Sequence, residues 1–111
     1  MNEHNLKEDI FNILRILSSN TTLTQRQISN FLGISLGKTN YLLRALMGRG
    51  LVKMKNFATN KGKIKKVRYI LTKKGIEEKI KLTRFFLEKK EKEYLELKRE
   101  LESTLNLEFK I

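Results

Sequence analysis

The sequence predicts a mainly α-helical chain with a small β-hairpin and a long C-terminal helix, and three observations support this fold class. Apolar residues recur at helical spacing in three segments before residue 50. Two segments in which apolar and basic residues alternate come next, as expected for paired strands. After residue 72 the sequence is rich in Glu, Lys and Leu, and the chain has no proline to interrupt a helix. A length of 111 residues fits one compact domain with an appendage, so we expect a domain at residues 1–72 and a helical extension with a tail at residues 73–111.

The first two helices have clear sequence signals. Residues 6–18 are expected to form the first, because five apolar side chains lie on one face, namely Leu6, Ile10, Ile13, Leu14 and Leu17. Thr24 caps the second, because Gln27 stands three residues later and completes a capping box. Gly33 suits the left-handed turn that ends a helix. The apolar side of this second helix is expected to be buried through Ile28, Phe31 and Leu32.

The third helix is expected at about residues 35–49, with Ser35 as its N-cap and Gly50 at its end. Four residues at positions i, i+3, i+4 and i+7 form its buried side, namely Thr39, Leu42, Leu43 and Leu46. The exposed side then carries Leu36, Lys38, Asn40, Tyr41 and Arg44. Gly37 lies near the start of this helix, where glycine costs up to about 1 kcal/mol relative to alanine. Either the absence of a Cβ lets a phosphate or base edge approach the backbone closely, or glycine is simply tolerated in the first turn.

A basic hairpin is expected next. Residues 51–57 and 66–72 are the two strands. In the first, Val52 and Met54 alternate with lysines, and in the second, Val67, Tyr69 and Leu71 alternate with Arg68 and Ile70. The chain carries a net charge of +12, and residues 51–75 contain nine Lys or Arg residues but no Asp or Glu. Most of the excess charge therefore lies in and beside the hairpin, where attraction of phosphate groups is expected.

The predicted C-terminal helix runs from residue 73 to about residue 104 and carries a repeating seam. Nine positions follow at alternating steps of four and three, and six of them are apolar: Ile76, Ile80, Thr83, Leu87, Lys90, Tyr94, Leu97, Leu101 and Thr104. Because this is the spacing of a coiled coil, we expect the seam to pair with a second copy of the chain. The expected dimer interface consists of Ile76, Ile80, Thr83, Phe86, Leu87, Tyr94, Leu97 and Leu101.

Two alternatives remain open in this C-terminal part. Packing of Phe85 and Phe86 against the first helix of the same chain is as compatible with the sequence as packing in a dimer. The last residues, "LNLEFKI", alternate with period two, so they are expected either to form a strand or to fray.

Composition narrows the classes of function. A pI near 10.1 favours a polyanionic partner, either nucleic acid or an anionic membrane surface. The chain has no cysteine, which excludes disulfides, thiolate metal sites and cysteine nucleophiles, and its single histidine, His4, has no apparent partner. We therefore expect no enzyme activity, no cofactor and no metal site. No apolar run is long enough to span a membrane and no signal-peptide pattern is present, so a cytoplasmic protein is expected.

Helix, helix, turn, helix and hairpin, in this order, are the plan of a winged helix-turn-helix domain, whose third helix contacts DNA. In a major groove Asn can bond adenine, Arg can bond guanine and Tyr can touch a thymine methyl group or the backbone, so base contacts are expected from Asn40, Tyr41 and Arg44. Phosphate contacts are expected from Gln25, Ser35 and Lys38. The full set of expected DNA-contacting residues is Gln25, Ser35, Leu36, Gly37, Lys38, Asn40, Tyr41 and Arg44 in the helices, with Lys61, Lys63 and Lys65 in a wing at residues 58–65.

Other interpretations of these residues are weaker. The polar side of the third helix and the lysines of the hairpin can be ordinary solvated surface, as charge-rich segments often are. A protein-interaction adaptor that assembles through its coiled coil is the main alternative function, and the basic hairpin argues against it. RNA binding is less favoured, because no aromatic platform for stacking single-stranded bases is evident.

The stretch "TQRQISNFLGISLGKTNYLLRALMGRGLVKMKNF" followed by "YILTKKG" resembles the winged-helix domain of the MarR superfamily. Within it, "GISLGKTNYLLRAL" and "VKMKNF" are most similar to the small group of EPS-associated (exopolysaccharide-associated) regulators. The resemblance implies a homodimeric, sequence-specific regulator of transcription that binds double-stranded DNA at an inverted repeat. It also implies that the helix after Thr72 is the dimerisation element. MarR proteins are typically longer and dimerise through both ends of the chain, so an effector pocket of their kind is not expected here.

Overall fold

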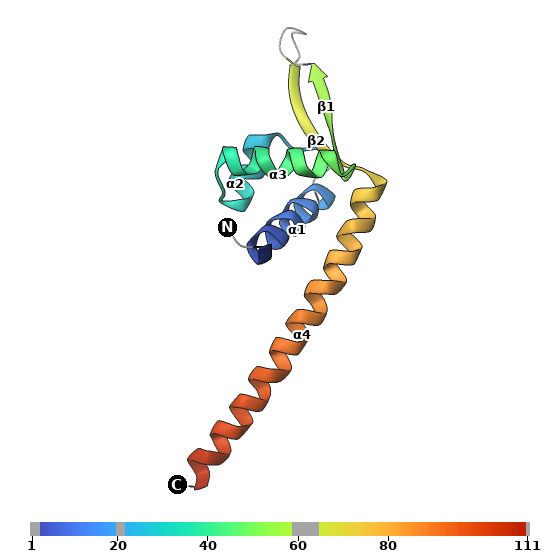
Figure 1. Cartoon of the computed structure of the whole chain (residues 1–111). Helices are drawn as coiled ribbons and strands as arrows, with labels where there is room; N and C mark the ends of the chain where they lie inside the picture. The colour runs from blue at the N-terminus through green and yellow to red at the C-terminus, as the bar shows by residue number, and fades with distance from the viewer. Residues whose placement is uncertain (1–2, 20–21, 59–64, 111) are drawn as a thin grey trace. The chain divides into compact units, whose positions relative to one another are not determined.

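The computed structural model describes residues 3–19, 22–58 and 65–110, and it confirms the predicted fold class (Figure 1). Its elements are α1 (Glu3–Ser19), α2 (Gln25–Leu32), α3 (Leu36–Gly48), β1 (Val52–Ala58), β2 (Lys65–Leu71) and α4 (Lys73–Lys110). The chain divides into two compact units, Met1–Ile80 and Lys81–Ile111. The first two turns of α4 therefore belong to the unit that contains the other elements.

The hydrophobic core of the first unit lies among its helices and the base of the hairpin. α1 packs on α2 and β2, and α3 packs on α2 and β1. The fully buried apolar side chains come from α1, α2, α3 and the residue just before β1: Ile13, Leu14, Ile28, Leu42, Leu43, Leu46 and Leu51. Thr39 is also fully buried, and its hydroxyl donates to the Ser35 carbonyl at 2.8 Å, so the buried polar atom is satisfied.

Both ends of α2 form as the sequence predicts. The Gln27 backbone N–H donates to the Thr24 hydroxyl at 3.2 Å, and the Thr24 N–H donates to the Gln27 side-chain carbonyl at 2.9 Å, which completes the capping box. Gly33 ends α2 with φ 66° and ψ 32°, a left-handed conformation that favours glycine. At this C-terminal end the Gly33 N–H donates to the Ser29 carbonyl at 2.9 Å, so local hydrogen bonds set where α2 begins and where it ends.

The prediction that Phe31 of α2 is buried is wrong. Phe31 is 63% exposed, whereas Ile28 and Ser29 are buried and Leu32 is half-buried. A helix of eight residues buries only a narrow side, and Phe31 lies beside that side rather than on it.

The hairpin is a two-stranded antiparallel sheet in which Val52 pairs with Leu71 and Met54 pairs with Tyr69. Val52 and Tyr69 are buried, but Met54 is 53% and Val67 is 39% exposed. The difference arises because the outer part of the hairpin extends past the helices, as Figure 1 shows, so the same side loses its cover.

An isolated β-bridge borders the hairpin and has no clear signal in the sequence. Leu23, just before α2, forms an isolated bridge with Tyr69: the Tyr69 N–H donates to the Leu23 carbonyl at 2.8 Å, and the Leu23 N–H donates back at 3.4 Å. This bridge connects the base of the hairpin to the start of the helix-turn-helix.

Thr72 organises the junction between β2 and α4. Its hydroxyl donates to the Gly50 carbonyl at 2.7 Å and accepts from the Gly75 N–H at 3.0 Å, so it also caps α4. Gly75 is buried against the backbone of Leu51, and a Cβ added there would overlap the Leu51 carbonyl oxygen. The start of α4 is thereby held against the end of α3 and the start of β1.

α4 continues to Lys110, beyond the end predicted near residue 104, and the alternative of a terminal strand is wrong. The alternating segment has no strand to pair with in the sheet, which contains only β1 and β2 in the described part of the chain. Continuing the helix gains one hydrogen bond per added residue, and Thr104 satisfies its hydroxyl within the helix by donating to the Glu100 carbonyl at 2.9 Å. No helix among the described residues is long and apolar enough to cross a membrane.

Candidate nucleic-acid interface

The exposed side of α3 carries amide, aromatic and basic side chains next to one another. Tyr41 is 62% and Leu36 is 40% exposed, and Asn40 and Arg44 are exposed as well. The four residues predicted for the opposite side are all fully buried, which confirms how the helix is oriented in the first unit. An outside partner can therefore contact this side of α3 along its length.

Gly37 and Gly48 lie on the same exposed side of α3, eleven residues apart. A Cβ added at either position meets no atom within 4 Å. Packing within the first unit therefore does not explain either glycine. Near the start of α3 in particular, the missing side chain leaves the backbone open to a close approach from outside the chain.

The N-terminal end of α3 is fixed by two interactions of the chain itself. The Ser35 hydroxyl accepts from the Lys38 N–H at 3.1 Å and caps the helix. The Lys38 ammonium nitrogen lies 2.8 Å from a carboxylate oxygen of Asp9 in α1, and both side chains are largely buried, at 25% and 18% exposed. The charge of Lys38, expected to contact phosphate, is therefore already paired inside the first unit.

Gln25, the first residue of α2, links the two helices of the turn. Its amide nitrogen donates to the Leu36 carbonyl at 3.1 Å, and its amide oxygen accepts from the Asn40 side chain at 3.1 Å. The sequence suggested Gln25 as a phosphate contact. Both ends of its amide are instead engaged with α3.

Arg44 lies between the exposed side of α3 and the hairpin. Burial raises the pKa of the Tyr69 phenol in β2, and the nearby Arg44 guanidinium partly offsets the rise. Tyr69 is only 6% exposed and stays neutral at ordinary pH, so its side chain is part of the buried base of the hairpin.

The expected wing contacts fall largely outside the described residues. Lys61 and Lys63 lie outside them, and Lys65 is described only as a backbone position at the start of β2. In the described part of the hairpin, Lys53 and Lys55 are exposed on β1. The base of the wing therefore presents positive charge in its own right.

The expected dimer residues in the second unit are mostly exposed. Leu87, Tyr94, Leu97 and Leu101 are 60–65% exposed, and Thr83 is exposed too. Phe86 is 8% exposed, and its neighbour Phe85, whose ring centre lies 5.1 Å away, is 43% exposed. In the first unit, Ile76 and Ile80 are 49% and 47% exposed.

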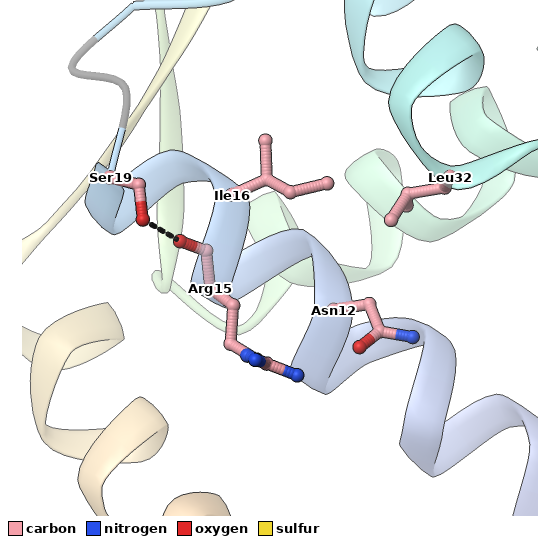
Figure 2. A pocket seen from close by; sticks show the side chains of 5 residues that line it. All are labelled: Asn12, Arg15, Ile16, Ser19 and Leu32. Atoms are coloured by element: carbon pink, nitrogen blue, oxygen red, sulfur yellow. Dashed lines mark hydrogen bonds between the residues drawn. The ribbon is translucent and has the colours of Figure 1, made fainter.

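A second concave site lies between α1 and α2 (Figure 2). It is an open pocket of about 310 Å³ lined by Asn12, Arg15, Ile16, Ser19 and Leu32. The Arg15 guanidinium stands 5.3 Å from the centre of the Phe11 ring, and its backbone carbonyl accepts from the Ser19 hydroxyl at 3.1 Å. These lining residues come from α1 and α2, so the pocket is not part of the exposed side of α3.

The partners of these site residues could not be predicted from the sequence. Asp9 and Gln25 are distant in sequence from the α3 residues that they hold, and no local pattern marks such pairs. The spacing of Ser35 and Lys38, in contrast, is a cap signal that the sequence does display.

These features define a winged helix-turn-helix chain, with α2 and α3 as the helix-turn-helix and the hairpin as the wing. Residues 10–53 match the family model for winged helix-turn-helix DNA-binding domains. No curated protein sequence matches the chain.

Solved structures give the same fold. The chain is similar to ZitR of Lactococcus lactis, a zinc-responsive MarR family member. A ZitR mutant in apo form is 28% identical with TM-score 0.63, covering 87% of this chain and 70% of that one. A ZitR mutant in complex with DNA is 28% identical with TM-score 0.60, covering 80% and 57%. PadR of Bacillus subtilis in complex with operator DNA is 21% identical with TM-score 0.56, covering 65% and 44%, and shows the fold alone. The match thus spans less than two thirds of both DNA-bound chains.

Proposed function

We propose that this chain is a transcriptional regulator that binds double-stranded DNA at an inverted repeat as a homodimer, without catalytic activity. The observation that carries the proposal is the exposed side of α3, where Asn40, Tyr41 and Arg44 follow Gly37, at which an added Cβ would meet no atom within 4 Å. Such a surface has the donors, acceptors and access needed to contact base edges in a major groove. A role on operator DNA is consistent with the cytoplasmic location expected from the sequence.

The contacts divide between α3 and the wing. Asn40, Tyr41 and Arg44 contact bases, and Leu36 touches a thymine methyl group or the sugar-phosphate backbone. Ser35 contributes a phosphate contact at the start of α3, and the wing residues Lys61, Lys63 and Lys65 contact the backbone or the adjoining minor groove. Lys38 holds α3 through Asp9 in this proposal and gives up its expected phosphate contact.

The likeness to ZitR supports the proposal, because a ZitR mutant has been solved in complex with DNA on a similar fold. The narrower resemblance to the EPS-associated regulators rests on the sequence of α3 and β1 and is part of the proposal as well. The basic hairpin adds sequence-independent attraction to phosphate, which an interaction adaptor does not need.

Dimerisation through α4 is proposed on two grounds. In the second unit, Leu87, Tyr94, Leu97 and Leu101 expose more than half of their surface at coiled-coil spacing. Burying a large apolar side chain contributes about 1.5 to 3 kcal/mol, and an isolated helix in water gains none of this. A second copy supplies the same stripe, and two-fold symmetry then places two copies of α3 about 34 Å apart or a multiple of it.

Selection of bound sequences from a random duplex library tests the function. We expect an inverted repeat to emerge, and its affinity to fall by about 10³ to 10⁵ between 50 and 200 mM salt if six to ten phosphates are contacted. Arg44→Ala should weaken operator binding by about 1 to 3 kcal/mol with little effect on random duplex. Arg84→Ala, which removes the same charge from α4, is the matched control. Absence of duplex binding, or binding that salt does not weaken, contradicts the proposal.

A further inference from the structure

The side chains of Gln25 and Asn40 form a hydrogen-bonded chain that ends on the backbone of α3. The Gln25 amide nitrogen donates to the Leu36 carbonyl at 3.1 Å, and the Asn40 amide nitrogen donates to the Gln25 amide oxygen at 3.1 Å. The chain crosses from the first residue of α2 to the second turn of α3. It therefore ties one residue of the exposed side of α3 to a neighbouring helix.

The chemistry of these groups fixes which way each amide faces. A backbone carbonyl only accepts, so Gln25 must turn its nitrogen toward Leu36 and its oxygen toward Asn40. Asn40 must then turn its nitrogen toward Gln25, and a flipped amide would place two oxygens against each other. The side-chain oxygen of Asn40 and its second N–H remain available on the exposed side of α3.

We infer that Gln25 is a positioning residue, and that the operator carries an adenine opposite Asn40 in each half-site. The inference rests on the proposed function. In the major groove adenine presents an acceptor at N7 beside a donor at N6, which matches one oxygen and one N–H held in a fixed order. Guanine presents two acceptors, cytosine a donor and thymine an acceptor with a methyl group, so none of them satisfies both atoms of Asn40.

Holding Asn40 before DNA arrives also lowers the cost of ordering it in the complex. A free asparagine on a helix surface samples several rotamers and both amide orientations, and binding must select one. The bond to Gln25 makes that selection in the free protein. Gln25 thus influences base preference without itself contacting DNA.

The test compares wild type with Gln25→Met, which keeps the length of the side chain and removes both hydrogen bonds. Asn30→Ala, an exposed amide lost from the same helix, is the matched control. The first measurement needs no DNA: NMR relaxation of the Asn40 side-chain amide. We expect an ordered amide in wild type and in Asn30→Ala, and a mobile one in Gln25→Met. An equally ordered amide in Gln25→Met overturns the positioning role.

The second measurement uses the operator found by selection and the same operator with the adenine pair exchanged for a G·C pair. In wild type the exchange should weaken binding by about 5- to 150-fold, the range of a bidentate base contact. In Gln25→Met that ratio should shrink to a few-fold, with binding to random duplex unchanged. An unchanged ratio in Gln25→Met overturns this inference and leaves the proposed function intact. The same holds if selection with wild type gives no preferred adenine, or if Asn40→Ala still prefers every adenine that wild type prefers.

Two other outcomes also decide the matter. Equal losses on operator and random duplex in Gln25→Met identify Gln25 as a phosphate contact and overturn its positioning role. Failure of wild type to bind any duplex overturns the proposed function and the adenine assignment with it, while the NMR measurement still decides whether Gln25 orders Asn40.

Discussion

Replacing Gly37 with alanine should make the protein more stable and its binding to DNA weaker. The stability gain follows from the first turn of α3, where the added Cβ meets no atom within 4 Å and so introduces no clash. Glycine-to-alanine changes at helical positions that accept a side chain stabilise proteins by about 0.4 to 1 kcal/mol. For a unit of this size, the midpoint of thermal unfolding should rise by about 2 to 8 °C.

The loss of binding has a different origin. If the backbone at Gly37 lies against the duplex, an added methyl group overpacks a close interface at a cost of about 1 to 3 kcal/mol. Operator affinity, measured by fluorescence anisotropy, should therefore fall by about 5- to 150-fold. Opposite changes in stability and binding separate an interface glycine from a structural one, because damage to the fold lowers both.

Gly48→Ala supplies the matched control. Gly48 is equally open but lies at the far end of α3, about 16 Å along the helix axis, whereas base contacts in this type of domain come from the N-terminal part of the recognition helix. We expect it to gain stability with operator affinity unchanged. If Gly37→Ala also binds with wild-type affinity, Gly37 is merely tolerated and the duplex does not approach α3 there. A loss of stability in Gly37→Ala would contradict the open space around it.

Three further substitutions test other parts of the structure. Gly75→Ala should lower the free energy of unfolding by about 1 to 3 kcal/mol in urea titrations, because its Cβ overlaps the Leu51 carbonyl oxygen, and a neutral result would refute that close contact. Lys90→Leu should tighten the proposed dimer in sedimentation equilibrium, because it removes a charge from the seam, and an unchanged association constant would place residue 90 outside the interface. Tyr69→Phe should alter stability only at high pH. Because the pKa of the Tyr69 phenol is raised in the folded protein, its contribution to wild-type stability is complete below about pH 10 and is lost as the pH rises through the folded-state pKa. The variant should therefore lose less stability than wild type between about pH 10 and 12. Parallel pH curves for Tyr69→Phe and wild type would show that the phenol is not shifted.

The elements could be predicted from the sequence because local signals define them. Thr24 with Gln27, Gly33 and Ser35 each act within a few residues, and each forms the cap or turn expected of it. The buried side of α3 was equally predictable, since a helix fixes which residues share a face. Burial could not be predicted where it depends on how much of a helix its neighbours cover. Phe31, beside the narrow buried side of α2, is the clearest case.

The residues on the surface of the candidate site could be predicted from the sequence, but their hydrogen-bond and ion-pair partners could not. Periodicity alone assigns Asn40, Tyr41 and Arg44 to the exposed side of α3. It contains no information on Asp9, which lies 29 positions before Lys38 and pairs with it only because α1 passes the start of α3. A phosphate contact was predicted for Lys38 because its charge is evident from the sequence, whereas its pairing with Asp9 is not.

Both ends of α3 are tied to neighbouring helices through charged side chains, and this decides how the chain can attract DNA. Lys38 pairs with Asp9 at the start of the helix, and Arg49, just after its end, lies 3.3 Å from Glu78 in α4. The more exposed pair, Arg49 with Glu78, contributes about 0 to 1 kcal/mol to stability, and both pairs reduce the positive potential that a phosphate encounters. Within the described chain Arg44 forms no ion pair, so it is the α3 base left to face DNA. Attraction of DNA phosphates, which is independent of the DNA sequence, must then come mainly from the hairpin. Preference for particular bases comes from the middle of α3. Substitutions in the hairpin should therefore change the salt dependence of binding to every duplex, and substitutions in α3 should change which duplex is preferred.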